Sequence, residues 1–448
     1  MRKLCLAFFL SFIIVAGNAQ QNKLLVDSVD SFSSRKNLTD NQLLDLVQKQ
    51  TLRYFWDFAH PVSYMARERS NEAFDYGGEV VTTGGTGFGV MAIIVGVDRH
   101  WIPRDSAVHR LLKMLHFLSK ADSYHGVFPH WLNGTTGKTI PFGRKDDGAD
   151  LVETSYLFEG LLCARQYFND TTSRAETQLR NIINSLWNDI EWNWFTRDGQ
   201  EVLYWHWSPN NGWAMNFPIR GYNECLITYV LAASGERYPV SAAVYHRGWV
   251  QSDFFKNGKQ FYGYTLPLGF DYGHPLFYTH YSFLGLDPHG LKDRYADYWE
   301  QNENHTLINY TYCVKNPEGY KGYGPDCWGL TSSDNYEGYD AHSPTNDKGV
   351  ITPTGALSAF PYTSDHSMAA LKHFYYDMGK KIWGEYGFTD AFSESKNWYA
   401  TEYLAIDEGP IVDMIENYRT GLLWKLFMSC DEVKNGLKKL GFTSPYIK

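Results

Sequence analysis

Helical periodicity is the feature of this 448-residue sequence that most constrains its fold. Apolar residues recur at helical spacing in about twelve segments, which differ in character. The amphipathic segments lie near 41–59, 105–121, 172–189 and 239–251. The segments that are apolar or rich in small residues on most faces lie near 86–98, 150–168, 222–234, 364–380 and 410–429. Further helices are expected near 276–284, 292–304 and 430–440.

This alternation predicts two concentric layers of helices. A helix that is apolar around its circumference is buried, whereas an amphipathic helix lies outside it. We therefore expect an all-α fold, an (α/α)6 barrel or toroid in which inner helices are ringed by outer ones. A helical solenoid is the alternative, but no residue period recurs along the sequence.

Short strands and hairpins are expected in the long loops of the barrel. These loops span 124–142, 190–218 and 255–275. The Asn-Gly pairs at 133–134 and 257–258 favour hairpin turns, because both residues tolerate the left-handed backbone that such turns need.

The first residues predict an export signal. Arg2 and Lys3 precede an apolar run, and small residues at 17 and 19 fit cleavage after Ala19. A buried N-terminal helix is the alternative, but the charge, the apolar run and the small residues occur in the order of an export signal. The run is too short to span a bilayer. The expected division is therefore a signal peptide at 1–19, a polar lead-in at 20–38 and one catalytic domain at 39–448, in a periplasmic or secreted protein.

The formal net charge of −9 limits the partners that the chain can bind. Loss of the predicted leader removes two cations and leaves the chain more acidic. An acidic protein is a poor match for nucleic acid or an anionic membrane. The composition favours a neutral substrate, and we expect a monomer without membrane insertion.

Histidine and cysteine spacing predicts neither a metal nor another cofactor. The histidines are scattered, without an HExxH pattern, and no CxxC pair is present. An odd number of cysteines follows the leader, which leaves at least one thiol free. Cys313 and Cys327 could close a loop in an oxidising compartment.

The sequence is rich in aromatic residues, with 15 Trp, 32 Tyr and 27 Phe. Many of the rings fill a large core. Others fall in segments rich in Gly, Asn and Pro, such as Trp192–Phe195 and Tyr204–Trp207. Loops normally carry function on a rigid scaffold. The C–H face of a sugar ring stacks on a flat apolar ring, so these loops favour a carbohydrate ligand.

Carboxylates occur at the starts of several expected inner helices. In an α/α barrel, these helix starts converge on one mouth. Asp150, Asp365 and Asp407 could be helix caps or first-turn acids, because acids favour the positive end of a helix. Glu224 is not a favoured cap. A half-buried carboxyl at its position would have a raised pKa, which suits a general acid.

Glycoside hydrolysis needs two carboxyls, one on each side of the scissile bond. One protonates the leaving oxygen and the other activates water or attacks the sugar. Glu224 together with Asp146 or Asp150 supplies such a pair. Asp146 and Asp150 could lie one turn apart if their helix starts early.

Three segments resemble a known family. They are Gly-Ala-Asp-Leu-Val-Glu-Thr-Ser at 148–155, Gly-Tyr-Asn-Glu at 221–224 and Ile-Asp-Glu-Gly-Pro-Ile at 406–411. Together they resemble the bacterial glucoamylase-like domain and, more closely, the endo-β-1,2-glucanases of glycoside hydrolase family 144. The resemblance covers the chain from about residue 40 to the end. It implies an (α/α)6 barrel and inverting hydrolysis of linear β-1,2-glucan to short sophoro-oligosaccharides.

The resemblance also implies roles for particular residues. Glu224 is expected to be the general acid, and Asp146 or Asp150 the base, with the other supporting it. Asp407 is a rival base. The residues expected to stack on sugar rings or bind hydroxyls, chosen for their position near the mouth, are Trp131, Phe142, Trp205, Trp213, Arg220, Tyr222, His280, Asp407 and Tyr418.

Other functions on the same barrel stay open. A transglycosylase or a phosphorylase would share the fold and the acids. A polysaccharide lyase would need an acidic substrate, which suits this acidic chain poorly. A non-catalytic protein would bind glucan and release nothing.

Overall fold

The structure, a computed structural model, describes residues 38–70 and 78–447. Within these ranges it is predominantly helical, with short strands in the loops. The helices are α1 Asp40–Trp56, α2 Thr83–Asp98, α3 Arg104–Leu118, α4 Leu151–Tyr167, α5 Arg174–Asn188, α6 Leu226–Ser234, α7 Tyr298–Lys315, α8 Pro353–Leu357, α9 Ser364–Lys372, α10 Gly379–Ile382, α11 Ala405–Thr420, α12 Leu422–Ser429 and α13 Asp431–Leu440.

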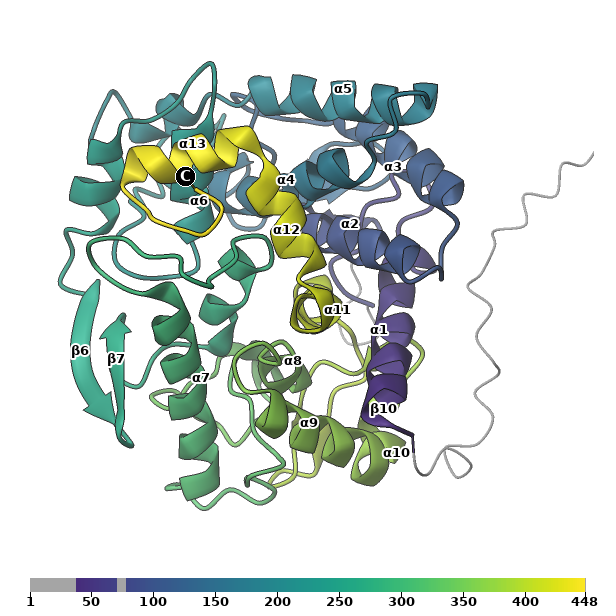
Figure 1. Cartoon of the computed structure of the whole chain (residues 1–448), viewed down its shortest axis with the longest axis vertical. Helices are drawn as coiled ribbons and strands as arrows, with labels where there is room; N and C mark the ends of the chain where they lie inside the picture. Colours follow the sequence, from purple (N-terminus) through teal and green to yellow (C-terminus); the bar gives the residue numbers. More distant parts are fainter. Residues whose placement is uncertain (1–37, 71–77, 448) are drawn as a thin grey trace, which may run out of the picture.

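The helices form an (α/α)6 barrel, as the alternation predicts. Helices α2, α4, α6, α8 and α11 are buried on nearly every side. Helices α3, α5 and α13 bury one stripe, as outer helices do. Figure 1 shows α11 nearly end-on within the ring, with α5 and α7 at its edge.

Local signals set the ends of several helices. Thr39 and Gln42 form a capping box at the start of α1. Gly421, in the left-handed conformation, ends α11. The Gly-rich start of α2 allows close packing on α4, because a Cβ on Gly87 would overlap the backbone of Tyr156. A glycine-rich pattern here therefore marks helix contact and not a phosphate loop.

Several predicted helices differ from the observed ones. The segment 364–380, expected inside the barrel, is the outer helix α9 followed by a π-helical turn at His373–Asp377. The inner position belongs to α8, whose five residues are too few to show a period. The segment 276–284 forms two 3₁₀ turns, and the segment 239–251 contains a π-helix at Val244–Trp249. The helix expected near 292–304 is α7, which begins later.

Pro410 lies inside α11. A proline removes the N–H that would bond the carbonyl four residues earlier. That carbonyl belongs to Ile406, and it accepts a hydrogen bond from the Tyr281 hydroxyl at 3.0 Å. The tyrosine therefore satisfies the group that the proline leaves unbonded.

Short antiparallel strands lie in the loops. They are β1 Val80–Thr82, β2 Trp131–Asn133, β3 Thr139–Ile140, β4 Ala149–Asp150, β5 His206–Trp207, β6 Lys256–Phe261, β7 Tyr264–Leu268, β8 Ser332–Asn335, β9 Gly338–Ala341, β10 Trp383–Gly384, β11 Gly387–Phe388, β12 Phe392–Ser393 and β13 Trp398–Tyr399. Strand β2 lies between β1 and β3, and the others form two-stranded pairs.

The two predicted Asn-Gly turns have different outcomes. Asn133 and Gly134 begin the turn between β2 and β3, as expected. Asn257 and Gly258 lie within β6, where the register shifts, and the hairpin turns at Tyr262 and Gly263 instead. A positive φ at Gly258 can therefore mark a bulge as well as a turn.

The predicted signal peptide and most of the lead-in lie outside the described residues, so the division of the chain stays a prediction. Cys313 and Cys327 are buried and carry free thiols, and no disulfide joins them. Within 38–70 and 78–447, the helices are too short or too polar to cross a membrane.

Candidate active site

Asp150 is held at the junction of β4 and α4. Its Oδ1 accepts hydrogen bonds from the backbone N–H groups of Val152 and Glu153, both at 3.0 Å, so it caps the helix. The same oxygen accepts a hydrogen bond from Trp205 Nε1 at 2.9 Å. Asp150 is fully buried. Asp150 is thus both a helix cap and a catalytic candidate. Its hydrogen bonds hold the carboxylate in one position, on which both roles depend.

Asp146 reaches the same place from a loop. It belongs to a tight turn in which its N–H donates to Gly143 O at 3.0 Å. Because α4 begins at Leu151, the expectation that Asp146 and Asp150 lie one helical turn apart is wrong. His206 joins them, since its Nε2 is 3.3 Å from Asp146 Oδ2 and 3.6 Å from Asp150 Oδ2. The pairing of β4 with β5 places His206 opposite Asp150.

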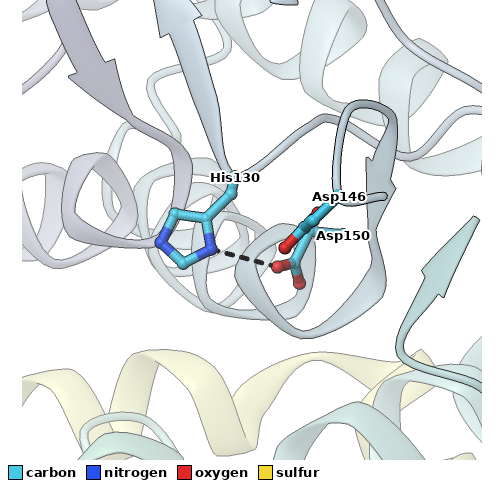
Figure 2. Close-up of side chains that lie close together, drawn as sticks. All are labelled: His130, Asp146 and Asp150. Atoms are coloured by element: carbon cyan, nitrogen blue, oxygen red, sulfur yellow. Dashed lines mark hydrogen bonds and ion pairs between the residues drawn. The ribbon is translucent and has the colours of Figure 1, made fainter. Parts of the chain in front are cut away.

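His130 also contacts Asp150, and Figure 2 shows its imidazole pointing toward the Asp150 carboxylate. Its Nδ1 is 3.2 Å from Asp150 Oδ2, and its Nε2 is 4.0 Å from a carboxylate oxygen of Glu153. Phe142 stacks on the imidazole with ring centroids 4.2 Å apart. Burial alone would lower the pKa of His130, but the carboxylates of Glu153 and Asp150 raise it to about 9.

The two aspartates differ in charge state. Burial, with the nearby charge of Asp150, raises the pKa of Asp146 to about 7. Burial also opposes ionisation of Asp150, but the hydrogen bond from His130 and the charge of His206 lower the pKa of Asp150 below its usual value. At neutral pH, Asp150 is ionised while Asp146 is close to its titration point.

Glu224 lies in the turn just before α6, which begins at Leu226 and thus later than predicted. Its Oε2 is buried without a hydrogen-bond partner among the described residues. Burial raises the pKa of Glu224 to about 7, although a hydrogen bond with Tyr278 acts against this. The charges of Asp150 and Glu153 add to the rise. At neutral pH, Glu224 is therefore close to its titration point, as Asp146 is.

His130, Asp146 and Asp150 also have the residue types of a metal site. One ligand atom from each lies within 4.8 Å of the others, the only such cluster in the part of the chain that the structure describes. With its raised pKa, however, His130 is protonated at neutral pH and has no lone pair to offer. A cation would first have to displace that proton. The absence of a metal stays a prediction.

Some of the predicted sugar-binding rings do surround the acids. Phe142 is half exposed, and Trp131 meets its edge at 4.8 Å. Trp205 is half buried above Asp150. The exposed ring of Phe217 lies 5.6 Å from Trp205 and was not predicted.

Two more predicted residues lie in the same loops but make other contacts. Trp213 packs among rings, 5.6 Å from Tyr204 and 6.4 Å from Trp194. Arg220 is exposed, and its guanidinium donates to Gly248 O at 3.2 Å. Either side chain is available to solvent, but neither touches the catalytic candidates.

Four more predicted residues make other contacts. Tyr222 is buried, and its hydroxyl donates to Asn302 Oδ1 at 3.4 Å. His280 is buried at the turn between the two 3₁₀ segments. Asp407 is buried and hydrogen-bonded with Asp390, and burial keeps its pKa well above the usual range. Tyr418 lies in the last turn of α11, about 20 Å along the helix from its start.

The sequence reasoning missed several residues that touch the acids, namely His130, His206, Glu153 and Tyr278. Glu153 stood inside the quoted segment 148–155 and received no role. His206 had a weaker signal, because the chain separates it from Asp150 by 56 positions. Only the pairing of β4 with β5 brings His206 and Asp150 together.

Comparisons with known proteins show which family the chain resembles. A family model described as Glycoamylase matches residues 216–431. The structure of the Chitinophaga pinensis endo-β-1,2-glucanase with sophorotriose and glucose is similar at 56% identity and a TM-score of 0.89. That similarity covers 92% of this chain and 100% of the other.

The chain belongs to the bacterial endo-β-1,2-glucanase family, glycoside hydrolase family 144. A second member, the exo β-1,2-glucooligosaccharide sophorohydrolase of Parabacteroides distasonis, is 46% identical over 90% of this chain. The chain spans 58% of that relative's length. The Talaromyces funiculosus endo-β-1,2-glucanase shares the fold, with a TM-score of 0.57, at 12% identity.

Proposed function

We propose that the protein hydrolyses β-1,2-glucan as an inverting endo-glycosidase. The observation that carries this is one site that holds Glu224, with a pKa raised to about 7, together with Asp146 and the ionised Asp150. Glycoside hydrolysis needs one carboxyl that protonates the leaving oxygen and another that activates water. The names of the two bacterial family members supply the substrate class.

Glu224 is the proposed general acid. Its pKa of about 7 keeps a proton on part of the molecules at neutral pH. Its Oε2 has no partner among the described residues, so the protonated form can donate to a glycosidic oxygen. The proton passes to that oxygen as the bond to the anomeric carbon breaks. The Tyr278 hydroxyl then stabilises the carboxylate that forms.

Asp146 is the better candidate for the general base. Asp150 Oδ1 already accepts three hydrogen bonds, and its Oδ2 lies between two imidazoles. Asp146 has one histidine contact and a pKa near 7, which suits proton transfer at neutral pH. Asp146 would take a proton from the water that attacks the anomeric carbon, while Asp150 fixes His206 and His130.

Exposed rings on both sides of the acids support an endo mode. Phe142 and Phe217 lie on the side of the aspartates. On the side of Glu224, Phe254 stacks on Phe270 at 4.8 Å, and Phe254 O accepts the N–H of Tyr222.

The second ring pair continues inward toward the acid. Phe270 meets His274 at 4.0 Å, and His274 stacks on Tyr278 at 5.1 Å. Tyr278 in turn hydrogen-bonds Glu224. Rings that extend in both directions from the scissile bond suit a glucan chain that continues past it. A protein that removes only terminal units would need one side closed.

The substrate and mode are tested by product sizing. Linear β-1,2-glucan is incubated with the protein beside β-1,3- and β-1,4-glucans, and products are separated over time. An endo mode gives a range of sophoro-oligosaccharides early, whereas an exo mode gives one product throughout. The anomer formed first, followed by NMR, tests inversion. Failure to release sugar from β-1,2-glucan would refute the proposal.

The residue roles are tested by isosteric variants. Glu224→Gln and Asp146→Asn should each lower kcat by about 10²–10⁴-fold while the oligosaccharide still binds. Asp365→Asn is the matched control, because this exposed acid also lies in a first helical turn but outside the site. If Asp146→Asn keeps full activity and Asp150→Asn loses it, then Asp150 is the general base and Asp146 supports it.

We also propose that the protein is exported and acts as a monomer. The charged start and the apolar run of residues 1–19 support export. N-terminal sequencing of the mature protein from the producing cells should begin at Gln20. Light scattering should give the mass of one chain.

A further inference from the structure

A cavity of about 820 Å³ lies far from the catalytic residues. It is bordered by α5 and α13 and by the final residues of α4 and α6, which Figure 1 shows together at one side of the barrel. Asp150 and Glu224 precede the first turns of α4 and α6. Because α4 is 17 residues long, the cavity lies about 25 Å from the acids along that helix.

The cavity is lined with side-chain amides. Those that line it are Gln166, Asn169, Asn181, Asn184, Asn188 and Asn435. A carboxamide both donates and accepts hydrogen bonds, as a sugar hydroxyl does. The hydroxyls of Ser234 and Ser429 also line the cavity.

The charges of the lining balance. Arg165, Arg180 and Lys439 face Glu236, Asp431 and Glu432. Arg165 is bound to Glu432 at 2.5 Å and donates to Asn184 Oδ1 at 3.0 Å. Arg180 donates to Phe168 O at 2.7 Å. With two of its three cations engaged, the cavity is a poor site for a phosphate or another anion.

Two buried polar atoms at the cavity have no partner among the described residues. They are the indole Nε1 of Trp187, a residue that is 3% exposed, and the Oδ1 of Asn188. Phe158 and Trp192 pack against the Trp187 ring, each with centroids 5.6 Å away. Both atoms are closed off from solvent, so they lie behind the surface of the cavity. A ligand in the cavity would instead meet the exposed amides of Asn181, Asn184 and Asn435.

We propose that this cavity is a second, non-catalytic site for a short neutral oligosaccharide. Exposed amides and a balanced charge together match a ligand with many hydroxyls and no net charge. The volume is within the range of small-molecule pockets. The inference rests on the proposed function only for the choice of probe.

The test counts binding sites in the inactive Glu224→Gln protein. Isothermal titration with sophorotriose should give two sites, and Asn181→Ala combined with Asn435→Ala should remove one. Both amides are exposed, so the fold should tolerate the change. Lys438→Ala, an exposed residue of α13 outside the cavity, is the control and should keep two sites.

One site in Glu224→Gln, or two sites in the double variant, would overturn the inference. Titration with long β-1,2-glucan distinguishes a polymer segment from a released product as the occupant, and either one supports a sugar site. The proposed function is judged separately, from glucan cleavage by the unaltered protein. Cleavage with a single binding site would refute the second site alone.

Discussion

His130 places one positive charge among three carboxylates. Its contacts with Asp150 and Glu153 explain why its pKa rises although burial opposes the charged form. In return, its charge lowers the pKa of Asp146. Such coupled groups titrate as a set, so the pH profile should report the whole cluster.

Replacing His130 should move one limb of the pH–rate profile. In His130→Gln the cation is lost, the pKa of Asp146 rises, and a higher pH is needed to ionise this base. The acidic limb of kcat/KM should therefore move to higher pH. The alkaline limb, set by deprotonation of Glu224, should change little, because burial and other carboxylates dominate its pKa.

The control for this change is Phe142→Leu, which removes the stacked ring and keeps the imidazole. It should leave both limbs in place. A lower rate in His130→Gln with an unmoved acidic limb would mean that His130 acts through packing and not through its charge.

At the scale of elements, the contact of α2 with α4 sets the position of Glu153. A Cβ on Gly160 would overlap the carbonyl of Gly87, so the two backbones touch. The same approach lets Gly84 N donate to Glu153 Oε2 at 2.7 Å. The glycines of α2 thus hold a carboxylate of the site by bringing backbone and side chain together.

Gly160→Ala should separate these helices. Overfilling a packed contact costs about 1–3 kcal/mol, so the free energy of unfolding should fall by that amount in urea titrations. Gly324→Ala is the control, because its Cβ would meet nothing closer than 3.7 Å. Equal stability of Gly160→Ala and the unaltered protein would show that the helix contact adjusts without cost.

Over the whole molecule, several carboxyls are buried without a cation beside them. Asp413 is fully buried and neither of its oxygens has a partner in the described chain. Burial raises the pKa of Asp413, and also that of Glu159 and of Glu408. Each binds its proton more tightly in the folded state. Their contribution to stability is complete below about pH 4 and is lost as the pH rises toward the folded pKa.

Asp413→Asn removes one of these groups. The Tm of the unaltered protein should fall, relative to that of Asp413→Asn, when the pH is raised from 5 to 8. Asp365→Asn, at an exposed position, should show no such pH dependence. A constant difference for Asp413→Asn at both pH values would contradict a raised pKa.

The sequence predicted what periodicity can carry. The layers of the barrel follow from helices that are apolar all round, and Asp150 and Glu224 could be placed at helix starts. Helix α8 was not predicted, because its five residues are too few to show a helical period in the sequence. Whether Asp146 lies in a tight turn or in an early start of the helix stayed open, because nothing local in the sequence distinguishes the two. His130 and His206 reach the acids only through tertiary contacts.

The two-residue ladder of β4 and β5 has a consequence for how this family can vary. His206 turns toward the aspartates, while its neighbour Trp207 contacts Tyr124 and His125 on the other face. Shifting a strand by one residue exchanges its faces. A single-residue insertion between Tyr204 and Ser208 would replace the histidine with an indole, whereas lengthening the loop beyond Ser208 would not. Natural length variation and loop grafting should therefore be tolerated after Ser208 and excluded before it.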